Sequence, residues 1–177
     1  SYNDDLWMTS ASLNKVITSW IAWHTLGPNH TYKTELKYCG HEHYHINMTY
    51  DTNFQLAELK KLMSKIPSHH PHLSIHPVPL TEPYHPQWMI EDSHSDYTQQ
   101  LSPWLVTDES ITISLEQIKA LNPKIESSII SDEPSGCHTI AYHRSIPLRQ
   151  SMDQALLFSN NTTMDAIWLS VADYLEE

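Results

Sequence analysis

The chain has little glycine and no long apolar run, and each shortage excludes a class of structure. Only 3 glycines occur among 177 residues, so backbone positions with positive φ must be few or be occupied by Asn and Asp. No apolar stretch approaches the roughly 20 residues needed to span a bilayer, and no signal peptide is recognisable. We therefore expect a soluble, intracellular protein with no membrane partner. Cys39 and Cys137 lie far apart in the sequence, which does not indicate a disulfide scaffold.

Positive charge is also scarce. The chain has 10 Lys and Arg against 21 Asp and Glu, giving a formal net charge of −11. This balance argues against a nonspecific polyanion binder, because phosphate contacts need Lys and Arg. A hydrophobic content of 40% with 6 Trp indicates a folded globular protein. The length fits one domain over residues 1–177.

Hydrophobic periodicity predicts an alternation of helices and strands. Helices are predicted at 13–24, 56–66, 115–121, 152–158 and 163–175, and strands at 31–38, 43–50, 73–78, 105–106, 111–114 and 125–130, with 138–146 open to either. The predicted helix caps are Ser10 or Ser12, Asp51 or Thr52, and Thr163. This order predicts an α+β fold with a central antiparallel β-sheet flanked by helices.

The stretch GHEHYHINM, residues 40–48, contains two overlapping metal motifs. His41, Glu42 and His45 spell the zinc-protease string H-E-x-x-H, which requires a helix. His43 and His45 alternatively flank Tyr44 on a strand, where both side chains point to the same face. Glycine before the motif and β-forming residues after it favour the strand.

Hairpin geometry then suggests a third ligand. If the turn centres on Gly40, cross-strand residue numbers sum to 80, so Glu35 faces His45. Glu35, His43 and His45 would form a carboxylate-plus-two-imidazole set with open coordination positions. Such a set suits a divalent metal, Mg²⁺ or Mn²⁺.

This arrangement resembles a known family. Glu35, seven residues, then His43-Tyr44-His45 on a hairpin is similar to the nuclease domain of parvovirus replication initiators. These are the non-structural or Rep proteins of the HUH endonuclease superfamily. The segment 139–148, with its lone Tyr142, resembles that family's active-site tyrosine motif.

The resemblance implies a site- and strand-specific single-stranded DNA endonuclease, or nickase, that initiates rolling-hairpin or rolling-circle replication. Glu35, His43 and His45 would hold the metal that polarises the scissile phosphate. Tyr142 would attack and leave a 5′-phosphotyrosyl end. The implied partner is viral origin DNA, both its single-stranded nick site and the adjacent duplex. The helicase domain that accompanies the nuclease in the family is absent from these 177 residues, and the implied location is the host nucleus.

DNA contacts would have to come from local basic residues, for which Arg144, Arg149 and Lys65 are the candidates. The family's usual lysine after the tyrosine is replaced here, since Ser145 and Ile146 occupy the corresponding positions. Two alternatives stay open. One is a zinc hydrolase or protease that uses His41, Glu42 and His45. The other is a non-enzymatic metal-binding interaction domain, which the net acidity favours.

Overall fold

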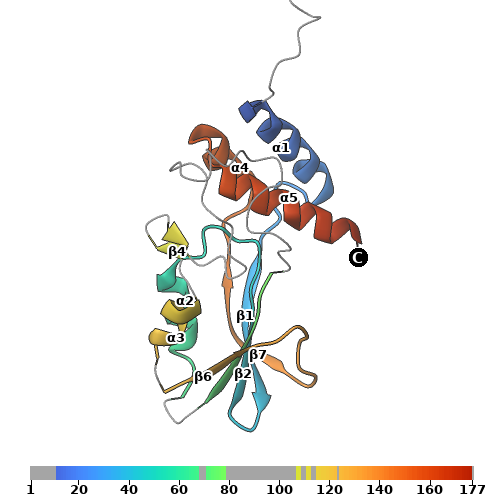
Figure 1. The fold of residues 1–177 in the computed structure, drawn as a ribbon. Helices are drawn as coiled ribbons and strands as arrows, with labels where there is room; N and C mark the ends of the chain where they lie inside the picture. Colours follow the sequence, from blue (N-terminus) through green and yellow to red (C-terminus); the bar gives the residue numbers. More distant parts are fainter. Residues whose placement is uncertain are drawn as a thin grey trace, which may run out of the picture.

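The structure is a computed structural model of the chain. It describes residues 11–67, 71–78, 107–108, 111–112, 115–122 and 124–176. The helices are α1 (Asn14–Thr25), which follows a 3-10 turn (Ala11–Leu13), α2 (Leu56–Met63), α3 (Leu115–Ala120), α4 (Leu148–Leu157) and α5 (Asn161–Glu176). The strands are β1 (Lys33–Gly40), β2 (His43–Asn47), β3 (His72–His76), β4 (Thr107–Asp108), β5 (Ile111–Thr112), β6 (Glu126–Ile129) and β7 (His138–Arg144). Figure 1 shows the helices α1, α4 and α5 gathered at one end and the sheet at the other.

The main sheet has the strand order β6-β3-β2-β1-β7. Strand β1 pairs antiparallel with β2 and β7, whereas β2–β3 and β3–β6 are parallel. The predicted α+β class is confirmed, but the prediction of an antiparallel sheet is wrong. The sheet is mixed because β2 and β3 are joined by a crossover that contains α2, and a crossover connection returns a strand in the parallel direction.

The sheet is apolar on one face and polar on the other. Leu36 pairs with Ile46 across β1–β2, and Leu73 and Ile75 of β3 pair with the same face of β2. These side chains join residues of α2 and α3, such as Leu62, in one buried core. The intervening residues of each strand point to the opposite face, where the histidines lie, as expected from the period-two alternation.

The turn between β1 and β2 differs from the predicted one. His41 and Glu42 both have positive φ, 49° and 60°, which is the backbone of a two-residue hairpin turn of type I′. The turn pairs Gly40 with His43, whose numbers sum to 83, and a register shift between Tyr38 and Gly40 lowers the sum to 82 along the rest of the ladder. Lys37 therefore faces His45, and Glu35 faces Asn47. The prediction that Glu35 lies directly opposite His45 is wrong because the turn lies beyond Gly40 and β1 is irregular beside it.

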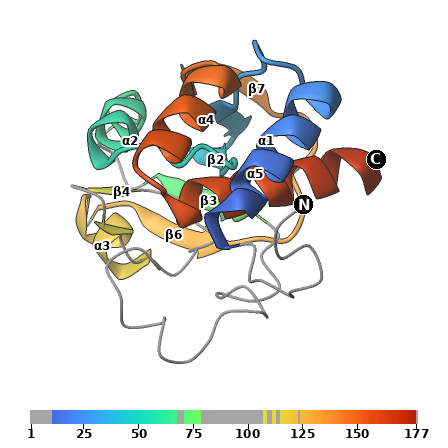
Figure 2. The ribbon, with the colours of Figure 1, turned by 90° about the horizontal axis from the view of Figure 1, so that it is seen from above.

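Helices α1, α4 and α5 form a second, smaller core. Figure 2 shows them packed across one another, with α5 crossing beneath α1 and α4. The core contains Ala22 from α1, Leu148 and Met152 from α4, and Ile167 and Val171 from α5, all buried. Gly27, with φ +89°, ends the first helical segment as predicted.

The sheet leads directly into this helical end. Beyond the β1–β7 ladder, the backbone N–H of Ser145 donates to the Tyr32 carbonyl at 3.0 Å, and that of Leu148 donates to the His30 carbonyl at 2.8 Å. The segment after α1 and the segment before α4 therefore stay side by side until α4 begins. This continuous pairing fixes where α4 starts relative to α1.

The two cysteines form a disulfide. Cys39 in β1 is bonded to Cys137, just before β7, with the Cα atoms 4.1 Å apart. The wide spacing of these cysteines, which does not indicate a disulfide scaffold, did not predict this bond. Their sequence separation of 98 does not indicate their proximity, because it arises from the non-local pairing of β1 with β7.

Most predicted elements are present in the structure, and 138–146, which the sequence left open, forms β7. The predicted caps of α2 and α5 are wrong. Gln55 precedes α2 without a side-chain cap, while Asp51 accepts a hydrogen bond from the Asn53 N–H at 3.0 Å. The predicted strand residues 105–106 and 113–114, and the candidate cap Ser10, lie outside the described residues.

Candidate active site

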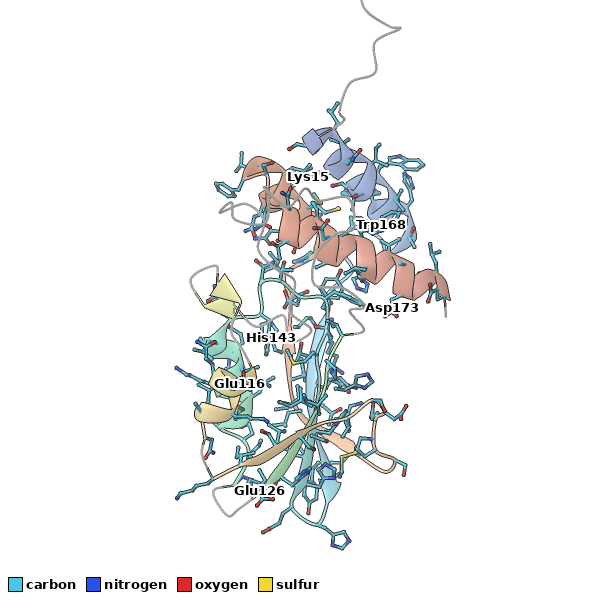
Figure 3. All side chains as sticks on the ribbon, viewed as in Figure 1. Lys15, Glu116, Glu126, His143, Trp168 and Asp173 are labelled. Carbon is cyan, nitrogen blue, oxygen red and sulfur yellow. A yellow bond between two sulfur atoms is a disulfide. The ribbon has the colours of Figure 1, made fainter. Side chains whose placement is uncertain are left out.

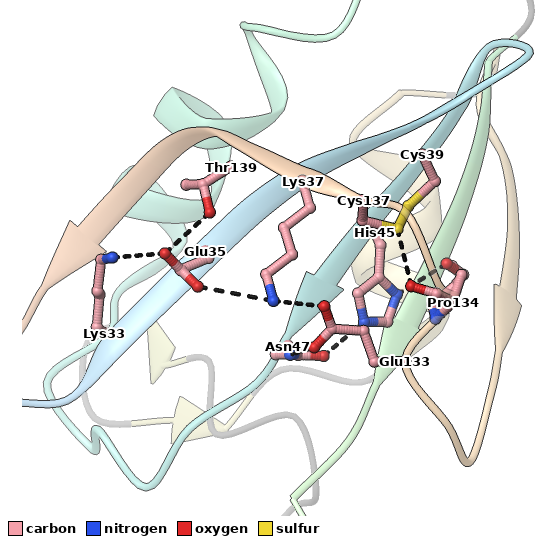
Figure 4. A network of polar contacts seen from close by, with 11 residues as sticks. Lys33, Glu35, Lys37, Cys39, His45, Asn47, Glu133, Pro134, Cys137 and Thr139 are labelled. Atoms are coloured by element: carbon pink, nitrogen blue, oxygen red, sulfur yellow. Dashed lines mark hydrogen bonds and ion pairs between the residues drawn. A yellow bond between two sulfur atoms is a disulfide. The ribbon is translucent and has the colours of Figure 1, made fainter.

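The polar face of the sheet carries the residues that the sequence singled out as metal ligands. Glu35 bonds to Lys33 at 2.5 Å and accepts a hydrogen bond from Thr139 at 3.0 Å. Lys33 is the main cause of a lowered pKa of the Glu35 carboxyl. Figure 4 shows that this carboxylate continues through Lys37 to Glu133. Glu35 is therefore engaged by lysines rather than by the histidines.

His43 and His45 are bonded to protein groups. The His43 Nε2 and the His45 Nδ1 each lie 2.9 Å from the Ser74 hydroxyl, and the His45 Nε2 lies 2.5 Å from the Asn47 Oδ1. His45 is 0% exposed, and burial is the main cause of a lowered pKa of its imidazole. Both imidazoles belong to a hydrogen-bonded network that Glu133 completes through Asn47.

This network contains no recognisable metal centre. Within the described ranges, no group of three His, Cys, Asp or Glu side chains could hold a metal ion. The expected Mg²⁺ or Mn²⁺ stays a prediction. The helix that the zinc motif needs is also absent, since His41 and Glu42 form the turn and His45 lies in β2.

The remaining predicted residues are spread over the molecule. Tyr142 faces Glu35 across β1–β7 and is 57% exposed, with the Lys33 ammonium 5.1 Å from its ring centre. The basic residues lie on three different segments: Arg144 in β7, Arg149 in α4 and Lys65 after α2. These three side chains come from separate elements rather than from one continuous strand or helix.

A compact cluster of hydroxyl and amine side chains lies at the helical end. The Lys15 ammonium donates to the Ser12 hydroxyl at 3.2 Å. The Ser12 hydroxyl lies 3.1 Å from the Ser159 hydroxyl. Residues separated by 147 positions in the sequence thus meet in a cluster of two hydroxyls and one amine.

Ser12 and Lys15 are brought together by local helix geometry. Ser12 lies in the 3-10 turn and Lys15 in the first turn of α1, so the two are three residues apart and share one face. The Ser12 side chain is exposed, whereas Lys15 is 9% exposed. Figure 3 places Lys15 among the helices α1 and α4. An accessible hydroxyl beside a largely buried amine is the pairing that activates a serine nucleophile.

The environment of Lys15 tunes its basicity. Burial lowers the pKa of the Lys15 ammonium, and the negative charge of Asp165 acts in the opposite direction, with burial the larger effect. Burial disfavours the charged form of an amine. The neutral amine that can accept a proton from Ser12 is therefore more abundant near neutral pH than it would be for an exposed lysine.

Ser159 is positioned by the junction between α4 and α5. Its φ is +53°, and it follows Phe158, the C-cap residue of α4. The N–H of Asn160 donates to the Ala155 carbonyl at 2.9 Å, which is the 6→1 bond of a Schellman motif. This motif places a residue with left-handed backbone directly after the helix, and here that residue carries a hydroxyl.

Asn160 also begins the next helix. Its side-chain oxygen accepts a hydrogen bond from the Thr163 N–H at 2.9 Å, as an N-cap residue does. The predicted cap Thr163 is therefore wrong by three positions. Because one residue ends α4 and begins α5, the conformation of Ser159 is fixed from both sides.

Sequence comparison identifies the family. Residues 1–128 match the model of the D-Ala-D-Ala carboxypeptidase 3 (S13) family, which is more than half of the chain. The chain belongs to the D-Ala-D-Ala carboxypeptidase 3 (S13) family. No curated protein sequence matches it.

Solved structures share the fold of this S13 family member. Penicillin binding protein 4 (dacB) from Haemophilus influenzae aligns with a TM-score of 0.70 at 13% identity, over 96% of this chain and 58% of that chain. The predatory endopeptidase Bd3459 from Bdellovibrio bacteriovorus aligns with a TM-score of 0.55 at 17% identity, over 96% of this chain and 49% of that one. The chain thus spans about half the length of these proteins.

Family membership overturns the functional predictions. A DNA nickase with Tyr142 as nucleophile is wrong, because the family comprises peptidases. Viral origin DNA and a helicase domain as partners, and the host nucleus as location, are wrong for the same reason. The HUH-like fold assignment is corrected by the alignment with penicillin binding protein 4.

Sequence reasoning missed the helical-end site although its motifs were visible. Penicillin-binding proteins carry S-x-x-K, S-D-N and K-T-G strings. Ser12 and Lys15 form the first string at the start of a helix, and Ser159-Asn160-Asn161 resembles the second, with Asn160 in place of Asp. The third, Lys-Thr-Gly, does not occur in these 177 residues. The sequence pattern predicts only a helix cap for Ser12, because a serine before a helix has an ordinary structural explanation. That prediction is wrong, since Leu13 is the N-cap of α1 and no side chain caps it.

Proposed function

We propose that the chain carries the nucleophilic centre of a serine peptidase that cleaves peptides ending in D-Ala-D-Ala. The observation that carries this proposal is the Ser12 hydroxyl with the Lys15 amine at 3.2 Å and the Ser159 hydroxyl at 3.1 Å. Membership of the S13 family supports the substrate class. One similar structure is described as a peptidoglycan endopeptidase, which supports cell-wall peptides as the source of that substrate.

The chemistry begins with acyl transfer to serine. The Ser12 oxygen attacks the carbonyl carbon of the scissile amide while neutral Lys15 accepts the Ser12 proton. The tetrahedral intermediate then expels the amine of the terminal D-Ala, which needs a proton. The Ser159 hydroxyl is placed to pass that proton from Lys15 to the leaving nitrogen. Water subsequently hydrolyses the ester on Ser12 and restores the free hydroxyl.

The disulfide supports a location outside the reducing cytoplasm. Disulfides such as Cys39–Cys137 form and persist in oxidising compartments, including the bacterial periplasm. A peptidase of the cell wall would encounter its substrate in such a compartment. None of the helices in the described part of the chain is long and apolar enough to cross a bilayer.

Covalent labelling tests the proposal. The chain is incubated with a fluorescent penicillin, which acylates the nucleophile of penicillin-binding proteins, and the adduct is mapped by mass spectrometry. We expect one adduct on Ser12 that is absent from Ser12→Ala. Ser10→Ala is the matched control and should label like the wild type. Release of D-Ala from a Lys-D-Ala-D-Ala peptide then tests turnover.

Two outcomes would contradict the proposal. One is a wild-type chain that forms no adduct at any pH between 6 and 9, an interval chosen around the ~7 at which a general base works best. The other is an adduct that persists in Ser12→Ala, which would place the nucleophile elsewhere.

A further inference from the structure

Asp165 of α5 lies next to Met164, which contacts the face of α1 that carries Lys15. Lys15 and Ser19 are four residues apart on α1 and therefore share a face. The Ser19 hydroxyl contacts the Met164 sulfur at 3.8 Å, and Asp165 is the next residue of α5. This face of α1 consequently packs against the turn of α5 that contains Asp165.

One oxygen of the Asp165 carboxylate is shielded from water. Its Oδ2 atom exposes less than 1 Å², and the neighbouring Met164 and Ala166 are buried. A carboxylate in such a place is costly unless a positive charge is near it. Lys15 is a cation on the neighbouring helix face, and the Asp165 charge raises the pKa of its ammonium against the larger, lowering effect of burial.

We propose that Asp165 is a positioning residue of the active site: its partly buried carboxylate is the counter-charge of Lys15 and holds the ammonium beside the Ser12 hydroxyl. The proposal deepens the function proposed above and rests on it. When Lys15 takes the Ser12 proton, a new ammonium forms in a largely buried site. Asp165 stabilises that ammonium without touching the substrate, so it acts through Lys15 rather than on the reacting atoms.

The consequence is a balance between two opposing effects. Burial lowers the pKa of Lys15 and makes it a weaker base, whereas the charge of the Asp165 carboxylate acts in the opposite direction. A general base works best when its pKa lies near the operating pH. Removing the carboxylate should therefore shift the pH at which Lys15 becomes neutral downward and should also weaken the base.

The test is the pH profile of penicillin acylation in the full chain, with Asp165→Asn as the main variant. The acylation rate should rise with pH as Lys15 becomes neutral and then reach a plateau. In Asp165→Asn we expect this rise, the acidic limb of the profile, to move to lower pH by about one unit and the plateau rate to fall about tenfold. Asp165→Glu should restore the limb towards its original position. Asp153→Asn, which removes an exposed carboxylate of α4, is the matched control and should leave both quantities unchanged.

A second readout separates this proposal from the proposed function. The ¹³Cε resonance of Lys15 in lysine-labelled protein, assigned with Lys15→Arg, reports its titration whether or not acylation occurs. If wild-type protein is not acylated, the proposed function fails, and the titration alone decides the role of Asp165. A Lys15 titration that is unchanged in Asp165→Asn overturns the proposal. So does an acidic limb that stays in place while the plateau rate falls, because a purely structural role would have that effect.

Should Asp165→Asn not fold, Asp165→Ser provides a smaller neutral side chain for the same measurements.

Discussion

The helical end and the sheet end of the molecule both contain clusters of polar side chains, but the clusters differ in what surrounds them. On the sheet, His45 is fully buried and both of its nitrogens are hydrogen-bonded. At the helical end, Ser12 and Ser159 bond to each other while their side chains remain exposed. A polar group that is already satisfied and buried stabilises a fold, whereas an exposed hydroxyl beside a buried base is available to a substrate.

The two ends also differ in exposed apolar surface. Partly or fully exposed large apolar side chains of the helical end include Leu13, Val16, Ile17, Trp20, Trp23, Leu156, Leu157, Phe158, Trp168, Tyr174 and Leu175, whereas those of the sheet are Ile129, Ile140 and Tyr142. Trp168 of α5, labelled in Figure 3, is one of these exposed side chains. The concentration of polar residues on the sheet is thus misleading as a guide to function. Its histidines attract attention, yet the catalytic candidates lie beside the apolar helices.

The strongest test of this comparison is a pair of substitutions, one at each end. Lys15→Met should lower the rate of penicillin acylation by about 10²–10⁴-fold, because Ser12 loses its general base. Tyr142→Phe, on the sheet, should leave that rate unchanged within about twofold, since the family assignment excludes Tyr142 as nucleophile. Stopped-flow or gel-based labelling measures both. A strong loss in Tyr142→Phe with little loss in Lys15→Met would reverse the assignment of the two ends.

Removing the disulfide should affect the sheet but not the site. In Cys39→Ala/Cys137→Ala we expect the free energy of unfolding to fall by about 2–4 kcal/mol, because the crosslink restricts the unfolded chain over a long loop. Urea unfolding followed by tryptophan fluorescence measures the loss. Penicillin labelling at low denaturant should persist, because the disulfide is part of the sheet end. An unchanged unfolding midpoint would show that the crosslink does not contribute to stability.

A smaller effect is expected from the histidines of the sheet as the pH falls. Burial lowers the pKa of His45, so below its usual value of about 6.5 the unfolded chain binds more protons than the folded one. Stability from this group is therefore present above pH ~6.5 and is lost as the pH falls through the lowered pKa. The loss is about 1.4 kcal/mol for each pH unit that separates the folded from the unfolded pKa. In His45→Gln, the free energy of unfolding measured by urea titration should decline less between pH 7 and pH 5 than in the wild type. The exposed His24 offers the control His24→Gln, which should keep the wild-type slope.

Local features of this protein were predictable from its sequence, and non-local ones were not. The periodicity of α1, the stop at Gly27 and the strand character of His43 to Asn47 follow from neighbouring residues. The parallel pairing of β2 with β3 and the bond between Cys39 and Cys137 depend on segments that are distant in sequence. The predicted register of the hairpin is wrong for two local reasons: two non-glycine residues adopt positive φ in the turn, and the register shifts between Tyr38 and Gly40.

The site itself shows the same limit. Ser12 and Lys15 are adjacent by helix geometry and could have been recognised as a motif. Their approach to Ser159 could not, because it depends on how α1 packs against α4 and α5. A motif with a plausible structural explanation, such as a serine that caps a helix, conveys its chemistry only when its distant partner is recognised.

Because Ser159 has a left-handed backbone, stability and activity favour different residues at this position. Glycine is the residue that this position accepts without strain, and a serine there costs about 1 kcal/mol or more. Selection for stability alone would replace Ser159 by glycine and delete the hydroxyl that meets Ser12. An engineer seeking a more heat-resistant chain would therefore find an easy gain at the residue that the chemistry can least spare.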